Sequence, residues 1–392
     1  MLNFLWLRVL VQEELRDREE QVNRRNFIRL LGAGSAAALA ASRAWGALDD
    51  LGPWNSYRLS YHIELPESSA PARLWVPVPL LEDSSYQRNQ GTVWTGNAQK
   101  VDFDPLSPAA APRVYAEWTR PGPRTLEIST IVKTLDRQVD LHQASGVAPL
   151  PPQARAFLAG TRLAPVDRDT RALAREATRG AASPLERARA IYEWVLSNVS
   201  YDLEGRGCGV GNVRAMIKAG KLTGRSADVS ALLVALARSA DIPGRLAFGL
   251  ALDRSRLSPV LGAYGDVSEG QEVRAELYVA GVGWVPVDPA NVLRAAFEGG
   301  LPLEDPRIVE LKNRLFGSWE MNWVVLNRWE RLSLRPQPSA LQLPYFAYPH
   351  AEIAAKPRDS LDHRHFAYTI RSVELVGTGA RFDGIPGVTK VQ

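Results

Sequence analysis

The sequence predicts an α+β fold in which an N-terminal β-sandwich precedes a second domain that combines helices with its own sheet. Three observations predict this fold. Apolar and polar residues alternate over residues 57–65, which is the period-two pattern of a half-buried strand. A capping-box motif opens a helix at Ser183. An almost continuously apolar helix over residues 226–240 is followed by three strand-like runs.

The predicted N-terminal domain covers residues 48–145 and consists of strands. Its alternating run contains the apolar residues Tyr57, Leu59, Tyr61, Ile63 and Leu65. Further strand-like runs occupy residues 73–77, 114–118 and 126–132. Breaks that contain proline or glycine separate these runs, and short strands separated in this way are typical of a small β-sandwich.

The predicted helical domain covers residues 152–300 and follows a proline-rich linker at residues 146–153. Residues 167–179 have helical character. The run Ser183-Pro184-Leu185-Glu186 is a capping box with proline at the first helical position, which is a strong start signal. The helix over residues 226–240 is apolar on almost every side, so we expect it to be buried. Three strands are predicted after it, at residues 245–252, 272–279 and 284–288.

A C-terminal extension of the core is predicted over residues 301–355, with a helix near residues 305–316. The aromatic residues that follow this helix are Trp319, Trp323, Trp329, Tyr345, Phe346 and Tyr348. Exposed Trp and Tyr are favoured anchors of protein interfaces, so the segment is a candidate interaction surface, with packing into the core as the alternative. Residues 356–392 are predicted to be a polar tail in which only residues 365–375 resemble a strand.

The composition indicates a globular protein and disfavours several classes of function. Of the 392 residues, 45% are hydrophobic and 23% are charged, as in proteins with a full core. The net charge is +4 and no basic run occurs, which disfavours nucleic-acid binding. The single cysteine, Cys208, excludes an intrachain disulfide. Since no haem, iron–sulfur or dinucleotide-binding motif occurs, we expect neither a cofactor nor a metal ion.

Residues 1–47 are predicted to be an export signal. The run that contains Arg24 and Arg25 resembles the twin-arginine export motif. The apolar stretch after it, Leu30 to Ala41, is shorter than the roughly 20 residues that span a bilayer. Small residues near Ala44 to Ala47 provide a cleavage site. We therefore expect a periplasmic protein; an amphipathic helix of a cytosolic protein and an uncleaved anchor are the alternatives.

The middle of the chain carries a series of motifs in a defined order. They are Ile191-Tyr192-Glu193-Trp194-Val195, Tyr201-Asp202, the glycine-rich loop 205–211, Gly224-Arg225-Ser226-Ala227-Asp228, Ile242-Pro243-Gly244-Arg245, Ala275-Glu276-Leu277-Tyr278 and Gly283-Trp284-Val285-Pro286-Val287-Asp288-Pro289. In order, spacing and identity these motifs resemble the bacterial transglutaminase-like superfamily, which has a papain-like core. The resemblance is strongest over residues 184–292 and extends weakly over residues 55–353.

The resemblance implies a catalytic triad in which two of the three positions are substituted here. In the family, a cysteine at the start of a buried helix is the nucleophile, a histidine on the next strand takes its proton, and an aspartate orients the histidine. The cysteine position is Ser226, two residues before Asp228. The histidine position is Glu272, four residues before Glu276. Only the aspartate is retained, as Asp288.

These substitutions predict a loss of catalysis. A thiol with a pKa of about 8.5 can be ionised by a helix N-terminus and a neighbouring imidazolium, whereas a serine hydroxyl needs a positioned base. Glu272 is a weak base, because a glutamate has a reference pKa of about 4.3. We therefore expect Ser226 to act as a helix N-cap, for which serine is favoured.

The strand that carries Glu272 predicts a charged cleft. Glu272, Arg274 and Glu276 share one face by period two, and the resemblance places that face in the cleft together with Asp228 and Trp284. We expect Arg274 to form an ion pair with Glu272 or Glu276.

Cys208, in the glycine-rich loop 205–211, is the alternative nucleophile, and a packed, unreactive thiol is the alternative interpretation of it. None of the five histidines lies between Tyr201 and Asp288, so none is expected to replace the missing base. Glu272 and Asp288 offer oxygen ligands that a hard cation accepts, but no metal-ligand spacing accompanies them.

The sequence therefore predicts an exported, catalytically inactive transglutaminase-like protein that acts as a binding or accessory subunit. The expected partner is a periplasmic protein, including a cofactor-containing client of the twin-arginine pathway, or a peptide or cell-wall fragment. The alternative is an active amide hydrolase or acyltransferase, of the protease or transglutaminase type, that uses Ser226 or Cys208.

Overall fold

The computed structural model describes residues 54–104, 111–144, 149–330, 334–341, 344–366 and 368–375. The chain divides into two compact units, Met1–Pro53 and Trp54–Gln392, and all described residues belong to the second. The predicted export signal, with Arg24, Arg25 and the cleavage segment 44–47, lies outside the described residues. Within the described part of the chain, no helix is both long enough and apolar enough to cross a membrane.

The first sheet has five antiparallel strands. In spatial order they are β11 (Gly265–Asp266), β18 (Tyr368–Glu374), β1 (Asn55–Leu65), β6 (Arg124–Thr134) and β3 (Gln87–Gly96). The alternation predicted for residues 57–65 is confirmed, because the five apolar side chains of β1 are buried while exposed or half-exposed residues stand between them. The pairing of β1 with β6 runs along the full length of both strands.

The second sheet also has five strands. In spatial order they are β17 (Lys356–Pro357), β16 (His350–Ile353), β2 (Ala72–Pro77), β5 (Arg113–Trp118) and β4 (Lys100–Asp104). Side chains from both five-stranded sheets, among them Leu59 of β1 and Leu74 of β2, belong to one buried apolar cluster. The two sheets therefore share a core.

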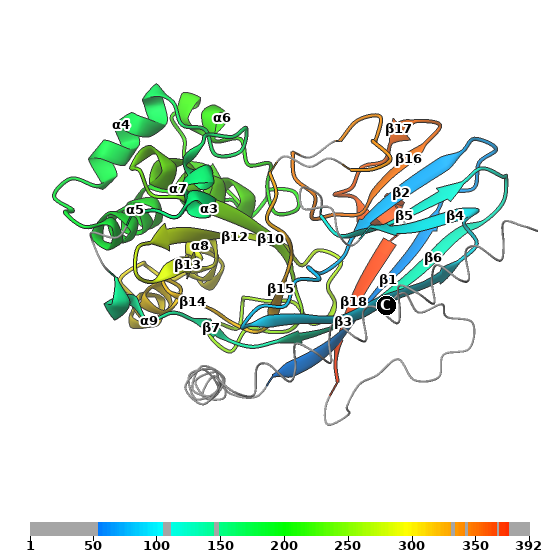
Figure 1. Cartoon of the computed structure of the whole chain (residues 1–392), viewed down its shortest axis with the longest axis horizontal. Coiled ribbons are helices and arrows are strands. Elements are labelled where there is room, and N and C mark those ends of the chain that lie inside the picture. Colours follow the sequence, from blue (N-terminus) through cyan, green and yellow to red (C-terminus); the bar gives the residue numbers. More distant parts are fainter. Residues whose placement is uncertain are drawn as a thin grey trace, which may run out of the picture. The chain divides into compact units, whose positions relative to one another are not determined.

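The C-terminal segment adds strands to both sheets, which differs from the predicted division at residues 301–355 and 356–392. β16 pairs with β2, and β18 pairs with β1 so that Ile370 lies opposite Tyr61. Figure 1 shows β18, in orange-red, beside β1, in blue. The physical reason is that β1 would otherwise present a row of unpaired backbone groups on one side. A strand was predicted near residues 365–375, and β18 is that strand, preceded by the short helix α10 (His363–Phe366).

The second part of the fold contains a four-stranded sheet and most of the helices. The strands, in spatial order, are β13 (Gly283–Val287), β12 (Gln271–Val279), β10 (Gly244–Ala251) and β15 (Trp323–Asn327). The first three of these correspond to the predicted strands. The fourth comes from the predicted C-terminal extension and pairs with β10.

Seven helices belong to this part among the described residues. They are α3 (Pro152–Arg155), α4 (Arg168–Ala177), α5 (Pro184–Asn198), α6 (Val213–Lys218), α7 (Ser226–Ser239), α8 (Pro289–Gly299) and α9 (Pro306–Arg314). The capping box predicted for α5 is present, because Ser183 Oγ accepts from Glu186 N at 3.1 Å and Glu186 Oε2 accepts from Ser183 N at 2.9 Å. Short elements complete the fold: β7 (Arg137–Gln138), β8 (Ser200–Tyr201), β9 (Thr223–Gly224), β14 (Ser318–Trp319), η3 (Leu141–Gln143) and η4 (Ala156–Leu158).

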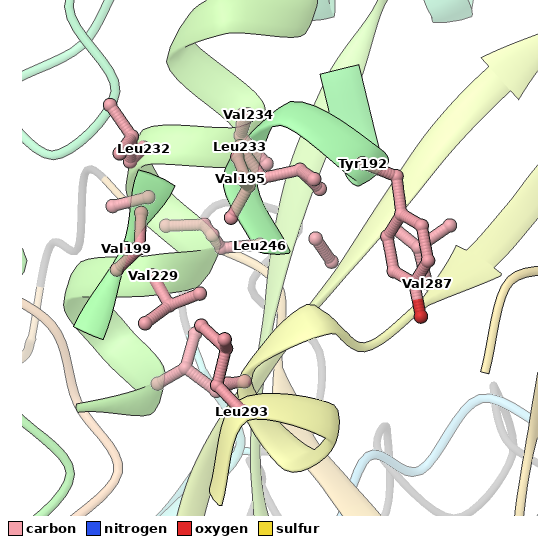
Figure 2. Close-up of a cluster of buried hydrophobic side chains, with 14 of the residues drawn as sticks. Tyr192, Val195, Val199, Val229, Leu232, Leu233, Val234, Leu246, Val287 and Leu293 are labelled. Atoms are coloured by element: carbon pink, nitrogen blue, oxygen red, sulfur yellow. The ribbon is translucent and has the colours of Figure 1, made fainter. Parts of the chain in front are cut away.

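Helix α7 is the centre of the larger hydrophobic core, as its apolar sequence predicts. Twelve of its fourteen residues are buried, and its apolar side chains pack with those of α5, α8 and the four-stranded sheet. Figure 2 shows Val229, Leu232 and Leu233 of α7 in this cluster. The burial fixes the position of the N-terminal end of α7, where the candidate site begins.

Most of the aromatic segment packs into the core. Trp319, Trp323, Tyr345, Phe346 and Tyr348 are all buried, with exposures of 2% to 4%. Trp329 is 38% exposed. The predicted aromatic interaction surface is therefore wrong, and the alternative of core packing is correct. Trp319, Trp323 and Tyr345 pack beside β10, Tyr348 contacts the glycine-rich loop, and Phe346 packs with Trp75 and Tyr115.

Candidate functional site

Ser226 is the first residue of α7 and is joined to two neighbouring segments. Its side chain is 5% exposed. Its Oγ accepts a hydrogen bond from Val273 N on β12 at 3.1 Å and donates one to the carbonyl oxygen of Cys208 at 3.5 Å. The helix is capped one residue earlier than predicted, at Arg225, whose backbone is extended. The Ser226 hydroxyl therefore has backbone partners for its proton and for a lone pair.

Asp228 attaches the glycine-rich loop to the start of α7. Its Oδ2 accepts from Arg225 N at 3.0 Å and its Oδ1 accepts from Gly211 N at 2.7 Å. Burial raises the pKa of Asp228, while these N–H donors oppose the shift. Glycine is required at Gly209, because φ is +97° and a Cβ would lie 2.1 Å from Asp228 Oδ2. Asp228 therefore stabilises the loop.

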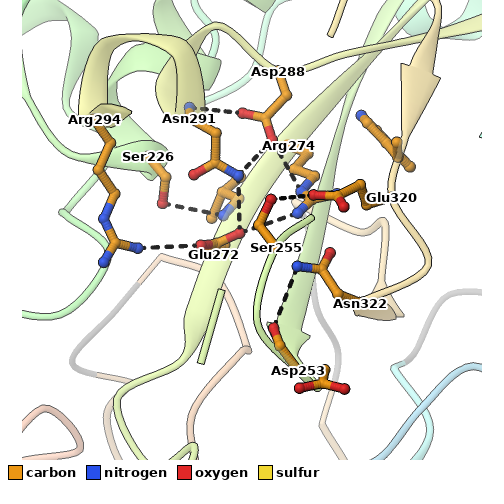
Figure 3. Close-up of polar contacts among 12 residues, drawn as sticks. Ser226, Asp253, Ser255, Glu272, Arg274, Asp288, Asn291, Arg294, Glu320 and Asn322 are labelled. Atoms are coloured by element: carbon orange, nitrogen blue, oxygen red, sulfur yellow. Dashed lines mark hydrogen bonds and ion pairs between the residues drawn. The ribbon is translucent and has the colours of Figure 1, made fainter. Parts of the chain in front are cut away.

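Glu272, at the position of the family's histidine, is surrounded by donors. The side chain of Glu272 is buried. Its Oε2 lies 3.3 Å from Arg274 Nη2 and 3.3 Å from Asn291 Nδ2, and its Oε1 lies 3.4 Å from Arg294 Nη1. Figure 3 shows these contacts reaching the carboxylate from β12 and α8. The predicted ion pair between Arg274 and Glu272 is present.

Asp288 is buried beside this carboxylate and caps α8. Its Oδ1 accepts from Asn291 N at 3.0 Å, and its Oδ2 accepts from Asn291 Nδ2 at 2.9 Å. Arg274 Nε lies 3.0 Å from Asp288 Oδ2. Burial raises the pKa of Asp288 to about 6; Arg274 opposes this rise and Glu272 adds to it. Asp288 therefore orients Asn291 and Arg274, since no histidine stands at position 272.

Arg274 bridges the two carboxylates from a buried position. Its side chain is 5% exposed, and its guanidinium carbon lies 4.5 Å from the centre of the Trp323 ring. A guanidinium over an aromatic face is stabilised by a cation–π interaction. A buried cation therefore lies between the side chains at the histidine and aspartate positions.

Glu276 and Trp284 belong to a second cluster, separate from the Glu272 carboxylate. Glu276 is fully buried and contacts three arginines: Arg137 at 2.6 Å, Arg245 at 2.7 Å and Arg328 at 2.8 Å. Burial by itself raises the pKa of Glu276, but the three guanidinium groups lower it well below its ordinary value. Arg245 also lies over the Trp284 ring at 4.0 Å. This cluster ties β7, β10 and the segment after β15 to β12.

A cavity of about 240 Å³, here called the Ser226 cavity, lies at the start of α7. Its lining includes Tyr201, Cys208, Arg225, Ser226, Glu272 and Arg294. The substituted nucleophile and base positions therefore open into one space. Among the described residues, the lining does not include Asp288 or the predicted cleft residues Asp228, Arg274, Glu276 and Trp284. Of the three charged residues predicted to share this strand face, Glu272 therefore lines the cavity, whereas Arg274 and Glu276 do not.

Cys208, the alternative nucleophile, is buried in the wall of the Ser226 cavity. Its Sγ lies 3.2 Å from Tyr345 Oη, and its backbone N–H donates to Tyr348 Oη at 2.8 Å. Burial raises the pKa of the Cys208 thiol, and the hydrogen bonds from Tyr345 and Tyr348 oppose that rise. The thiol is therefore protonated near neutral pH, which disfavours it as a nucleophile.

The described histidines lie outside this cavity. His350 is 3% exposed and packs beside Trp75, with ring centres 5.5 Å apart, and burial lowers its pKa. His363 Nε2 lies 3.1 Å from Glu269 Oε1. No group of three or more His, Cys, Asp or Glu side chains among the described residues is placed to hold a metal ion.

Sequence reasoning missed the residues that the neighbouring helices bring to the site. Asn291 and Arg294 reach Glu272 from α8, and Arg225 lines the cavity from the residue before α7. A signal for the first two was present, because Asp288, Asn291 and Arg294 recur every three residues across a helix start and so share one face.

Comparisons with known proteins identify a family for the central part of the chain. Residues 171–289, which include Ser226, Glu272 and Asp288, match the family model of the transglutaminase-like superfamily. A protein of Haemophilus influenzae described as uncharacterized is 30% identical over 334 residues, which cover 81% of this chain and 90% of that protein.

Two solved structures are similar to parts of the fold. A candidate cysteine protease from Cytophaga hutchinsonii has a TM-score of 0.49 and 16% identity, with 82% of this chain and 99% of that chain covered. The periplasmic domain of TgpA from Pseudomonas aeruginosa has a TM-score of 0.32 and 15% identity, with 68% of this chain and 96% of that chain covered. The family model shows that residues 171–289 form a domain of the transglutaminase-like superfamily.

Proposed function

We propose that this chain is a non-catalytic member of the superfamily that binds a peptide-like ligand in the cavity where its relatives' catalytic groups would stand. The observation that carries the proposal is the state of Glu272. Its carboxylate is held by Arg274, Arg294 and Asn291. Both of its oxygens are therefore engaged by these donors, and among the described residues it makes no hydrogen bond to Ser226, so it is not placed to act as a general base.

The candidate nucleophiles support the same conclusion. The Ser226 hydroxyl donates to a backbone carbonyl, not to a base, and a serine needs a positioned base to attack. The helix end adds only about 0.3–1 kcal/mol, far too little to ionise a hydroxyl. The Cys208 thiol has a raised pKa and contacts tyrosine hydroxyl groups. Neither side chain has the partner that nucleophilic catalysis requires.

The lining of the cavity favours a ligand with charges of both signs. Arg225 and Arg294 contribute cationic groups, and Asp266, Glu269 and Glu272 contribute anionic ones. A short peptide or a cell-wall fragment carries an ammonium, a carboxylate and amide groups, so it has a counterpart for each of these. This arrangement suits binding better than transfer of a neutral acyl group.

We further propose that the protein acts in the periplasm, as a ligand-binding or accessory subunit. This proposal rests on the leader sequence around Arg24 and Arg25. Co-purification of the tagged full chain from its own periplasm tests it, with stoichiometry measured by quantitative mass spectrometry. A stoichiometric partner supports an accessory role. A protein recovered only from the cytosol contradicts the proposed location.

A peptide-turnover assay tests the loss of catalysis. The purified chain is incubated with a degenerate pool of tripeptides, with and without added amine, and products are followed by mass spectrometry. We expect no turnover. Turnover that disappears in Ser226→Ala or Cys208→Ala would establish the alternative, an amide hydrolase or acyltransferase that uses that residue.

A cavity-filling variant tests the binding site. Ala263 lines the Ser226 cavity, and Ala263→Phe is expected to reduce retention of the tripeptide pool at least about tenfold, by occupying space that the ligand needs. Ala215→Phe, on the exposed side of α6, is the matched control and should retain peptides like the native chain. Equal retention by both variants, with native thermal midpoints, places the ligand elsewhere.

A further inference from the structure

A second cavity of about 260 Å³, here called the Tyr348 cavity, lies next to the Ser226 cavity. Both are lined by Gly207, Arg225 and Glu269. Arg225 therefore stands where the two spaces meet, between the degenerate catalytic positions on one side and Tyr348 on the other.

The glycine-rich loop holds the Arg225 side chain in a defined position. Its Nη1 donates to the carbonyl oxygen of Gly205 at 2.5 Å. A Cβ at Gly205 would lie 2.9 Å from Arg225 Cδ and 3.0 Å from Cγ, so the loop backbone lies directly against the arginine stem. The ring of Tyr201 lies 5.9 Å from the guanidinium carbon. Close contact of this kind reduces the side-chain entropy that ligand binding would otherwise cost.

The charge of Arg225 is not compensated by a carboxylate within the described part of the chain. Arg294 pairs with Glu272 and Arg206 pairs with Asp359, but no acidic side chain of a described residue lies within ion-pair distance of Arg225. The Nε of Arg225 is buried and makes no hydrogen bond among the described residues. The positive end of the fourteen-residue helix α7 starts at the next residue and adds to the local positive potential.

The rest of the lining indicates which anion would bind here. Asp266 and Glu269 line the Ser226 cavity with Glu272. Three carboxylates nearby repel a dianion such as phosphate more than a singly charged carboxylate. Asp266 and Glu269 also provide counterions for an ammonium group on the same ligand, whereas Glu272 is already paired with Arg274 and Arg294. The fork of a guanidinium matches the two oxygens of a carboxylate.

We propose that Arg225 binds a free carboxylate of the ligand, the C-terminal carboxylate of a short peptide, at the junction of the two cavities. This inference rests on the proposed function and specifies the chemistry of its ligand. The chain of the peptide then runs from Arg225 toward Ser226 and Glu272. A peptide with a blocked C-terminus lacks the group that Arg225 recognises.

The test compares a degenerate tripeptide pool as free acids with the same pool as C-terminal amides. Retention by the purified full chain is measured by native mass spectrometry. We expect the acids to bind at least about tenfold more tightly, the difference that a charge-assisted hydrogen bond provides. Arg225→Gln should remove this preference, and Arg225→Lys should keep part of it. Arg307→Gln is the control, since Arg307 is 72% exposed and paired with Asp305.

Each outcome distinguishes this inference from the proposed function. Equal retention of acids and amides by the native chain overturns the role of Arg225 while peptide binding stands. An unchanged preference in a folded Arg225→Gln variant also overturns it, as does displacement of the peptides by inorganic phosphate more readily than by acetate. If neither pool is retained, the proposed function fails, and the inference fails with it. Because the acid–amide comparison uses the native chain, it stays decisive if Arg225→Gln does not fold.

Discussion

Replacing Glu276 by glutamine keeps the shape of a fully buried side chain and removes the charge that three arginines share. Arg137, Arg245 and Arg328 lie 2.6–2.8 Å from its carboxylate oxygens. Their side chains are 10%, 19% and 18% exposed, so water can only partly replace the lost counterion. The variant leaves three cations crowded around a neutral amide.

The expected cost follows from this geometry. Removing one partner from a buried ion pair costs about 3–5 kcal/mol, because the remaining charge stays buried. Residual exposure of the three arginines lowers the cost, while their mutual repulsion raises it, so we expect Glu276→Gln to lose about 3–5 kcal/mol of unfolding free energy. Glu193→Gln is the matched control. Glu193 pairs with Lys312 at 3.0 Å but is 39% exposed, so the expected loss is below about 1 kcal/mol.

Urea denaturation at several pH values measures the effect. Because the pKa of Glu276 is lowered in the folded chain, the carboxylate stabilises the fold above its unfolded pKa of about 4.3 and loses this effect as the pH falls through the folded pKa. The difference between the native chain and Glu276→Gln should therefore be constant near neutral pH and narrow below about pH 4. A loss near pH 7 no larger than that of the control would refute this reasoning.

Three further predictions concern the site and its support. Burial raises the pKa of Asp288 from 3.8 to about 6. Between these pH values the folded chain holds a proton that the unfolded chain has released, so the free energy of unfolding should fall as the pH rises from 3.8 to about 6. Asp288→Asn should remove this pH dependence, measured as the change of the urea midpoint with pH. A pH dependence equal to that of the native chain would contradict the raised pKa of Asp288. Gly209→Ala places a Cβ 2.1 Å from Asp228 Oδ2 at φ +97°, and should lower the free energy of unfolding by more than about 2 kcal/mol. The control Gly180→Ala, at φ +85° in open space, should lower it by about 1–2 kcal/mol. Equal losses in urea denaturation would show that the loop relaxes around the new side chain. Leu233→Ala, in the fully buried centre of α7, should cost about 2–5 kcal/mol, and a cost under about 1 kcal/mol in the same measurement argues against tight packing there.

Local patterns in the sequence determined the type and place of the main elements. The alternation over residues 57–65 predicted β1, because side chains of a strand point to opposite faces. The capping box at Ser183 predicted the start of α5, because both hydrogen bonds form within one turn of the helix. The apolar run over residues 226–240 predicted a buried α7. Each signal depends on residues within a few positions of each other.

The candidate site was partly predictable for the same reason. The motifs around Ser226 and Glu272 identified two positions that meet at one cavity. The spacing of Arg274 and Glu272 on one strand face predicted their ion pair. The state of these groups was not predictable, since Arg294 and Asn291 reach Glu272 from a helix that the strand pattern does not describe.

Tertiary structure alone decided the long-range arrangements. β18 joins β1, although about three hundred residues separate them in the chain, because an edge strand can pair with any strand of matching pattern. Glu276 gathers arginines at positions 137, 245 and 328, and nothing in the local sequence pairs a buried carboxylate with those cations. Likewise Arg225 is a candidate ligand contact because the fold places two cavities beside it and no carboxylate of the described residues within ion-pair distance. Local hydrogen bonds and periodicity depend on residues that are close together in the sequence. Charge compensation and cavity shape depend on which distant segments the folded core brings together.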